Sequence, residues 1–291
     1  MKNIVGIFGA AVMCFAAISC QSGSSADKNI DNMDNRQSED TSSVKVEVAT
    51  TEGNFTVLLY GDTPLHRDNF VKLANEGYYD GTLFHRIIKD FMVQAGDPDS
   101  KNAKAGQALG SGGPDYKIDA EIVFPGHFHK RYALAAARQG DQVNPMRQSS
   151  GSQFYVVTGT KLDTAQVAQI DQRLKMNRMQ KAFNELAMAH RDSIQAMQMR
   201  GDRAGLNALQ EKLVAQVESQ FEGDTTSLVT PEMKEAYTTV GGAPHLDGEY
   251  TVFGEVISGF DTIDRIEKAE TDGRDRPKND IRITGMKVLD K

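Results

Sequence analysis

Short strand-like segments separated by turns recur along much of this chain and favour a mainly β fold, and the clearest of them alternates apolar and polar residues. Residues 44–48 read Val-Lys-Val-Glu-Val, and a second such segment, residues 54–60, follows a turn at Glu52-Gly53. Successive side chains of a strand point to opposite faces of a sheet, so the pattern predicts a β-hairpin with one buried face. Further short strands are predicted at residues 83–88, 92–95, 132–137, 153–158, 251–256 and 281–289.

Glycine-rich turns separate these strands, and few helices are predicted among them. Pro64 precedes a helical stretch from His66 to Asn75, in which Phe70 and Leu73 share one face, and Gly77 ends it. Many short strands with few helices favour a barrel or a sandwich.

Residues 163–239 differ from the rest of the chain because their apolar residues keep a helical spacing. Asp163 and Gln166 resemble a capping box, and Gly201-Asp202 separates two helical stripes. Thr230 and Pro231 have the character of an N-cap and a first helical residue of a third helix. The first helix is predicted to continue to Arg200, a length of roughly 55 Å. A small barrel cannot cover such a helix, so we expect a projecting helical hairpin inserted into the β domain.

The first twenty residues read as a targeting signal. Lys2 precedes an apolar stretch, residues 4–18, which is shorter than a membrane span and ends in small residues. The residues Ala17-Ile-Ser-Cys20 resemble the lipobox of bacterial lipoproteins, which implies cleavage before Cys20 and acylation of that cysteine. An ordinary signal peptide with a chance cysteine is the alternative.

The segment that follows, residues 21–43, is rich in Ser, Asp and Asn and predicts a flexible tether. The folded domain is expected to occupy residues 44–291, interrupted by the helical insertion at 163–239. Together with the signal, the tether predicts a protein of the bacterial cell envelope. We expect it to be anchored to a membrane through lipidated Cys20, either facing the periplasm or in the outer membrane.

Composition argues against several classes of protein. The chain has 33 basic and 40 acidic residues, a net charge of −7, so no nucleic-acid partner is expected. Both cysteines, Cys14 and Cys20, precede residue 21, which excludes disulfides and cysteine metal sites from the body. His127 and His129 could be read as metal ligands, but no third ligand clusters with them, so a loop is favoured. We expect neither a metal nor a cofactor.

Three separated blocks carry the chemical information. The first, from Phe84 to Asp97, reads FHRIIKDFMVQAGD. The second combines AAAR at residues 135–138 with SGSQFY at residues 150–155, and the third, residues 245–254, reads HLDGEYTVFG. In this order the blocks resemble the cyclophilin-type peptidyl-prolyl cis-trans isomerases. The resemblance covers most of residues 44–159 and 241–290 and leaves the helical insertion outside it.

The resemblance implies an eight-stranded antiparallel β-barrel capped by helices, with a peptide bound in a surface groove. The long α-helical hairpin predicted from the spacing of residues 163–239 is then an insertion into this barrel. It assigns Arg86 and Gln94 to catalysis. The positions that match the family's substrate-binding residues are Phe91, Met92, Ala137, Arg138, Gln153, Tyr155, His245, Leu246 and Tyr250.

Three of these positions depart from the best-known members. Tyr155 replaces a common Phe, and its hydroxyl needs a partner or water. His245 stands where the drug-sensitive members of the family carry Trp, and Tyr250 stands where His is frequent.

Rotation about an Xaa-Pro bond explains why such residues suit the task. The barrier of roughly 18–20 kcal/mol comes from lost resonance, and no bond breaks, so no nucleophile, base or metal is needed. An apolar pocket can hold the proline ring, while Arg86 donates hydrogen bonds to the prolyl carbonyl and nitrogen. These donors accelerate rotation only if they bind the twisted amide better than either planar isomer. Proline-containing polypeptides of the envelope are the expected partners.

A second reading is a binding module, in which the barrel serves as a proline-peptide receptor, chaperone or scaffold with incidental or no isomerase activity. A hydrolase is disfavoured because Gly151-Ser-Gln153 lacks the nucleophile-elbow pattern. The insertion could contact clients through flexible thioethers, pack its methionines internally, or self-associate. Its methionines are Met176, Met179, Met188, Met197, Met199 and Met233.

Overall fold

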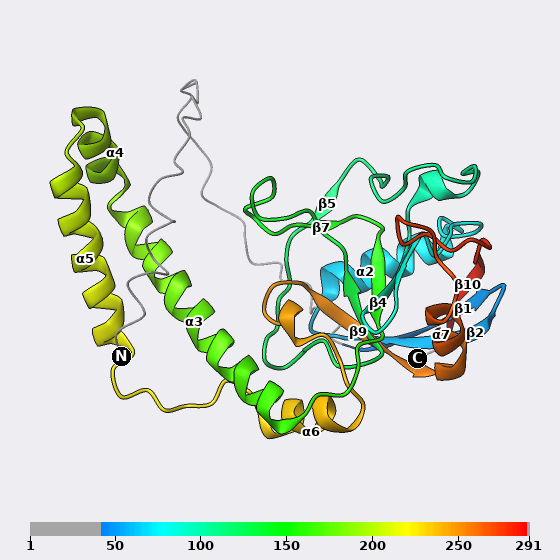
Figure 1. Ribbon diagram of the computed structural model, residues 1–291. Coiled ribbons are helices and arrows are strands. Elements are labelled where there is room, and N and C mark those ends of the chain that lie inside the picture. Colours follow the sequence, from blue (N-terminus) through cyan, green and yellow to red (C-terminus); the bar gives the residue numbers. More distant parts are fainter. Residues whose placement is uncertain (1–41, 290–291) are drawn as a thin grey trace, which may run out of the picture. The chain divides into compact units, whose positions relative to one another are not determined.

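An eight-stranded antiparallel sheet dominates the computed structural model, which describes residues 42–289 (Figure 1). Its strands are β1 (Val44–Thr50), β2 (Gly53–Leu59), β3 (Arg86–Ile88), β4 (Met92–Ala95), β6 (Ala133–Ala136), β8 (Phe154–Val157), β9 (Val252–Ser258) and β10 (Ile283–Leu289). They follow the order β10-β1-β2-β9-β6-β8-β4-β3. A separate pair consists of β5 (Lys117–Ile118) and β7 (Ser149–Ser150).

The α-helices are α2 (Pro64–Asn75), α3 (Thr164–Ala189), α4 (Arg191–Arg200), α5 (Arg203–Gln220), α6 (Pro231–Thr239) and α7 (Phe260–Glu267). Two α-helices, α2 and α7, alternate with the strands along the chain, and four, α3 to α6, follow one another between β8 and β9. Short 3-10 turns are η1 (Pro98–Ser100) and η2 (Pro244–Leu246). None of the helices within residues 42–289 has the length and apolar character that a membrane span requires.

Part of the predicted organisation falls beyond the described residues. The signal segment 1–20, including Cys20, lies outside them, as does the predicted tether apart from its last two residues.

The edges of the sheet meet just before β3 and β10, where Leu83 and Arg282 form an isolated β-bridge. The Phe84 N–H donates to the Ile281 carbonyl at 2.9 Å, and the Ile283 N–H donates to the Thr82 carbonyl at 2.9 Å. These bonds curl the sheet into a barrel, which confirms the predicted fold class.

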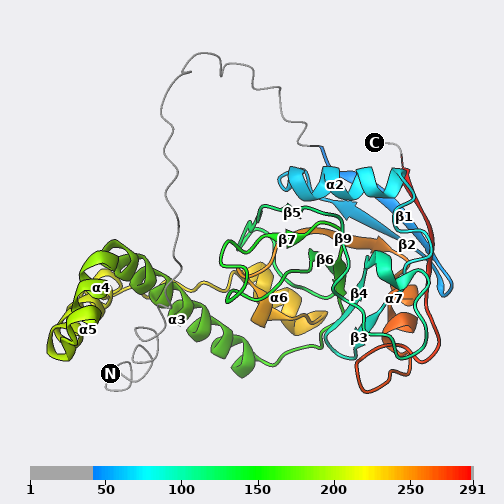
Figure 2. The ribbon, with the colours of Figure 1, turned by 90° about the horizontal axis from the view of Figure 1, so that it is seen from above.

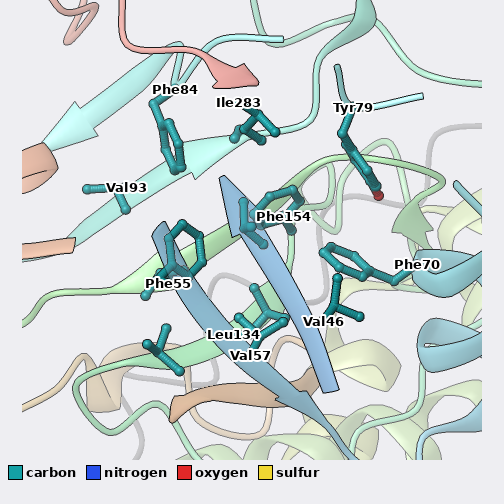
Figure 3. Packing of buried hydrophobic residues seen from close by; sticks show 14 of the residues in the cluster. Val46, Phe55, Val57, Phe70, Tyr79, Phe84, Val93, Leu134, Phe154 and Ile283 are labelled. Atoms are coloured by element: carbon teal, nitrogen blue, oxygen red, sulfur yellow. The ribbon is translucent and has the colours of Figure 1, made fainter. Parts of the chain in front are cut away.

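The barrel interior follows from strand alternation. Both β1 and β2 bury every second residue, including Val46 and Phe55. Phe70 of α2 packs edge-on against Phe154 of β8, with ring centroids 5.3 Å apart (Figure 3). α7, which the sequence pattern did not predict, adds Ile263 to the same core. Figure 2 shows α2 and α7 apart from each other with strands between them, and both helices contribute to the same core, as expected for a barrel capped by helices.

The predicted insertion is divided between two compact units. Asp171–Leu228 forms a helical unit, whereas residues 42–170 and 229–289 form the barrel unit, so α6 belongs to the barrel. Within the helical unit, Phe183 of α3 packs with Leu213 and Val217 of α5, which makes the predicted hairpin. The unit is closed at its base, since the Leu228 N–H donates to the Asp171 carboxylate at 2.6 Å.

The prediction of one continuous helix to Arg200 is wrong. α3 ends at Ala189 and α4 begins at Arg191. His190 between them leaves the helical conformation, at φ −104° and ψ 14°, and its Nδ1 lies 2.9 Å from the Leu186 carbonyl oxygen. A side chain that binds the backbone in this way competes with the helical hydrogen-bond ladder, so the helix breaks there.

A carboxylate distant in the sequence caps α2. Thr63, at the N-cap position, makes no capping bond with its side chain. Instead the carboxylate of Glu121 accepts the N–H groups of Leu65 at 2.9 Å and His66 at 3.0 Å. It also lies 2.6 Å from His66 Nδ1. An anion at this place satisfies free N–H groups and interacts favourably with the helix dipole.

Ser149 extends this contact, because its Oγ lies 2.9 Å from His66 Nε2. Ser149, His66 and Glu121 thus stand in the order of a nucleophile, base and acid. Ser149 and His66 are only 1% and 2% exposed, so a substrate cannot reach the hydroxyl. The arrangement ties β7 and the Glu121 segment to α2.

The Glu121 contact makes stability depend on pH. Burial alone would raise the pKa of this carboxyl, but hydrogen bonds from the His66 side chain and from two backbone N–H groups outweigh burial and hold the pKa below its ordinary value. The folded state therefore binds this proton less tightly than the unfolded state. The resulting stabilisation is present above about pH 4.3 and is lost as the pH falls through the lowered pKa.

We expect Glu121→Gln to reduce the free energy of unfolding by about 1–3 kcal/mol at pH 7, because the amide cannot satisfy all three donors. The difference from the parent should shrink at acidic pH, as the pH falls through the lowered pKa and the parent carboxyl also becomes neutral. Urea unfolding at pH 7 and at acidic pH measures this. Glu76→Gln, at an exposed position after α2, is the matched control. A loss that is the same at both pH values would contradict the assignment.

Candidate functional site

One row of side chains crosses the outer face of four neighbouring strands. Arg86 of β3 pairs with Gln94 of β4, Gln94 pairs with Tyr155 of β8, and Tyr155 pairs with Ala135 of β6. Their sequence neighbours, such as Ile87, belong to the barrel core. Because alternate residues face opposite sides of a sheet, the register that fills the core also places this row outside.

The row borders a pocket of about 380 Å³, a size within the range of small-molecule and peptide sites. Predicted site residues that line it are Arg86, Phe91, Met92, Gln94, Ala137, Arg138, Tyr155, Leu246 and Tyr250. The remaining two stand next to it. Gln153 bonds to Gln94, and the exposed His245 packs on Phe91 with ring centroids 5.0 Å apart.

The wall of the pocket is apolar on one side. Met92 and Tyr155 belong to a buried cluster on the outer face, against which Phe91, Leu246 and Tyr250 pack. Met92 comes from β4, Tyr155 from β8 and Leu246 from the 3-10 turn η2, so three separate elements define the shape. Such a wall can hold a compact apolar ring.

The other side is polar and linked by hydrogen bonds. Arg86 Nη1 lies 3.5 Å from Gln94 Oε1, and Gln94 Nε2 donates to Gln153 Oε1 at 3.0 Å. Gln153 Nε2 in turn donates to the Gly112 carbonyl at 2.7 Å. Arg86 Nε also lies 3.7 Å from the Asp275 carboxylate. The guanidinium is thus oriented from two sides, yet its side chain remains 43% exposed and can donate to a ligand.

Arg138 has a different role from Arg86. Its Nε donates to the Glu249 carbonyl at 2.9 Å and its Nη1 to the Gln139 carbonyl at 3.0 Å. The guanidinium carbon lies 4.5 Å from the centroid of the Tyr250 ring. With its side chain only 5% exposed, Arg138 supports Tyr250 and the adjacent loop.

The hydroxyl of Tyr155, which the sequence left without a partner, lies 3.0 Å from His129 Nε2. Burial raises the pKa of this hydroxyl well above its ordinary value, so it stays protonated and can donate to the imidazole. The departure from Phe at this position is therefore accommodated inside the protein.

Sequence reasoning missed one wall of the pocket. The residues concerned are His85, Gln107, Ala108, Leu109, Gly110, Asp272, Arg274 and Arg276. The His85 imidazole is buried, and neither ring nitrogen has a hydrogen-bond partner among the described residues. Burial lowers its pKa despite the nearby Asp97 carboxylate, so the ring is neutral at pH 7. The sequence feature that could have identified His85 as a pocket residue is its position directly before Arg86 in the FHR motif.

His127 and His129 take part in separate contacts. His127 stacks on Tyr60 at 4.1 Å and lies 2.7 Å from the Asp62 carboxylate. His129 contacts Tyr155 and Asp247. Across residues 42–289 no three His, Cys, Asp or Glu side chains gather in a group that could hold a metal ion.

Comparison with known proteins identifies the family of this chain. The family described as "Cyclophilin type peptidyl-prolyl cis-trans isomerase/CLD" matches residues 44–193 and 233–288. A Staphylococcus haemolyticus protein named for peptidyl-prolyl cis-trans isomerase activity is 28% identical over 253 residues, which cover 85% of this chain and 92% of that protein.

A Streptococcus pyogenes protein, named for bifunctional phosphatase and peptidyl-prolyl cis-trans isomerase activity, is 30% identical over 249 residues. The match covers 84% of this chain but only 39% of the streptococcal protein. A solved cyclophilin type isomerase of Cryptosporidium parvum aligns with a TM-score of 0.49 and 20% identity, over 86% of this chain and 99% of that one. Since the family match spans more than half of the sequence, this chain belongs to the cyclophilin-type peptidyl-prolyl cis-trans isomerases.

Proposed function

We propose that this chain catalyses the rotation of Xaa-Pro peptide bonds. The observation that carries the proposal is the exposed Arg86 guanidinium at the edge of the apolar wall formed by Phe91, Met92, Tyr155 and Leu246. A proline ring held against that wall leaves its amide beside the Arg86 guanidinium, which two acceptors, Gln94 Oε1 and the Asp275 carboxylate, keep in place. No other chemistry is required, because rotation neither breaks nor forms a covalent bond.

Catalysis then depends on what the site does to the twisted amide. As resonance is lost, the nitrogen becomes pyramidal and can accept a hydrogen bond from Arg86. The nitrogen of a planar isomer cannot accept this bond. Gln94 and Asp275 limit the motion of the guanidinium, so little reorganisation is needed when the amide twists. The apolar wall excludes water and strengthens these interactions.

Arg86→Ala should lower kcat/KM for an Ala-Pro peptide by about 100-fold, the scale on which losing one transition-state donor slows other enzymes. The assay compares the chain starting at Gln21 with this variant. Arg200→Ala, which removes an exposed arginine of α4, should match the parent. A folded parent that binds proline peptides without accelerating rotation would support the receptor or scaffold reading instead.

Gln153→Ala tests the hydrogen-bond chain behind Arg86. The change leaves Gln94 without its side-chain acceptor while Arg86 itself stays intact. We expect kcat to fall about three- to tenfold with a smaller change in KM, since the loss concerns orientation and not ring binding. An unchanged kcat would show that Asp275 alone is sufficient to orient Arg86.

We further propose that the enzyme acts on cell-envelope polypeptides while anchored through acylated Cys20. The support is the lipobox-like sequence before Cys20 and the tether after it. Expressed with its signal in a Gram-negative host, the parent should incorporate labelled palmitate and fractionate with membranes, whereas Cys20→Ser should do neither. Cys14→Ser is the matched control. Equal labelling of the parent and the Cys20→Ser variant would refute the anchor.

A further inference from the structure

Four buried polar side chains form a continuous path from the pocket wall to α6. The path begins at the Tyr155 hydroxyl, which donates to His129 Nε2 at 3.0 Å. His129 Nδ1 lies 3.0 Å from Asp247 Oδ1, and the Tyr237 hydroxyl donates to Asp247 Oδ2 at 2.5 Å. Of the four, only Tyr155 lines the pocket, so the hydrogen-bonded path reaches a ligand at Tyr155.

The directions of these bonds are consistent along the path. Asp247 also accepts the backbone N–H of His129 at 2.9 Å, so its carboxylate receives three donors. Because a carboxylate oxygen only accepts, Nδ1 is the nitrogen that donates to Asp247, and Nε2 is the nitrogen that meets the Tyr155 hydroxyl. His129 is 1% exposed, Asp247 3% and Tyr237 0%, so water cannot replace a missing member.

Close packing fixes the far end of the path. Thr230 caps α6 with its hydroxyl, and Pro231 is the first helical residue. A Cβ at Gly242 would come within 2.6 Å of the Tyr237 ring, so only glycine permits the backbone to pass there. The Leu162 N–H donates to the Tyr237 carbonyl at 2.9 Å, and Phe128 packs edge-on against the Tyr237 ring. Tyr237 therefore has one position available.

Such a path restricts the Tyr155 ring. A phenylalanine at residue 155 would fill the same wall with no polar requirement, whereas a buried hydroxyl must keep its partner or lose about 1–3 kcal/mol. Tyr250 meets the Tyr155 and His129 rings edge-on, at 6.2 and 6.4 Å, and blocks sideways movement. The Tyr155 ring consequently has little freedom to swing away from the pocket.

We propose that His129, Asp247 and Tyr237 are positioning residues that hold Tyr155 against the substrate proline, which makes α6 a part of the active site. The inference rests on the proposed isomerase function. It assigns to the last helix of the predicted insertion a role in substrate binding.

The test compares Tyr237→Phe and His129→Phe in the full chain, each alone and combined with Tyr155→Phe. In the parent background, both changes should raise KM about three- to tenfold with kcat within about twofold. Combined with Tyr155→Phe, neither should change KM further, because the path no longer reaches the ring. Tyr79→Phe, which removes another buried hydroxyl outside the pocket, should reduce stability with KM unchanged.

A role in folding alone predicts a different result. Both changes would then reduce stability while KM stays at the parent value, or KM would rise equally in both backgrounds, and either result overturns the proposal. Tyr237→Phe is the variant less disruptive to folding, because it keeps the ring and removes only the hydroxyl that bonds to Asp247.

A second measurement is independent of catalysis. The Met92 methyl group, in the same cluster as Tyr155, reports the ring position through its 13C and 1H chemical shifts. Tyr237→Phe should move the Met92 signal and Tyr79→Phe should not, and an unmoved signal in Tyr237→Phe refutes the positioning role. A parent with no isomerase activity would refute the proposed function, while the Met92 signal would still decide the inference.

Discussion

The two-residue periodicity of strands β3, β4, β8 and β6 is the constraint on which the rest of the structure depends. One set of alternate residues, such as Val93, Phe154 and Leu134, fills the barrel. The other set, which includes Met92 and Tyr155, builds the outer cluster beside the pocket. A slip of one residue would expose the core and bury Arg86 and Gln94, so core packing and site geometry are selected together.

Around this frame, polar groups are placed by networks and not by single contacts. Gln94, Gln153 and the Gly112 carbonyl extend the row behind Arg86, while Glu121 and His66 hold α2 on the barrel. Each network joins residues far apart in the sequence. Because a buried polar group without a partner is costly, these connections make the barrel tolerate few alternative loop conformations.

Much of the fold could be predicted because its signals are local. β4 has its predicted bounds, Thr230 caps α6 with its side chain, and Asp163 and Gln166 exchange the two bonds of a capping box at 2.8 Å each. The missed elements are short, because α7 has eight residues and β5 and β7 have two each.

The missed pocket wall has a different cause. Residues 107–110 and 272–276 approach Arg86 because loops distant in sequence bind each other. The Arg276 guanidinium, for example, donates to the Lys104 carbonyl at 2.8 Å. No periodic pattern in the sequence predicts such a contact between loops. The motif, by contrast, identified Arg86, Gln94 and Tyr155, since strand register determines their places.

The closed base of the helical unit has a consequence for how this chain could have arisen. The Asp171 carboxylate holds the Leu228 N–H, so the chain enters and leaves the helices at nearly one point. To the rest of the chain, everything between these residues is a loop, and the entropy of closing a loop grows only slowly with its length. The helices between Asp171 and Leu228 can therefore lengthen, shorten or be exchanged as one unit during evolution, provided that the segment carrying Tyr237 is left in place.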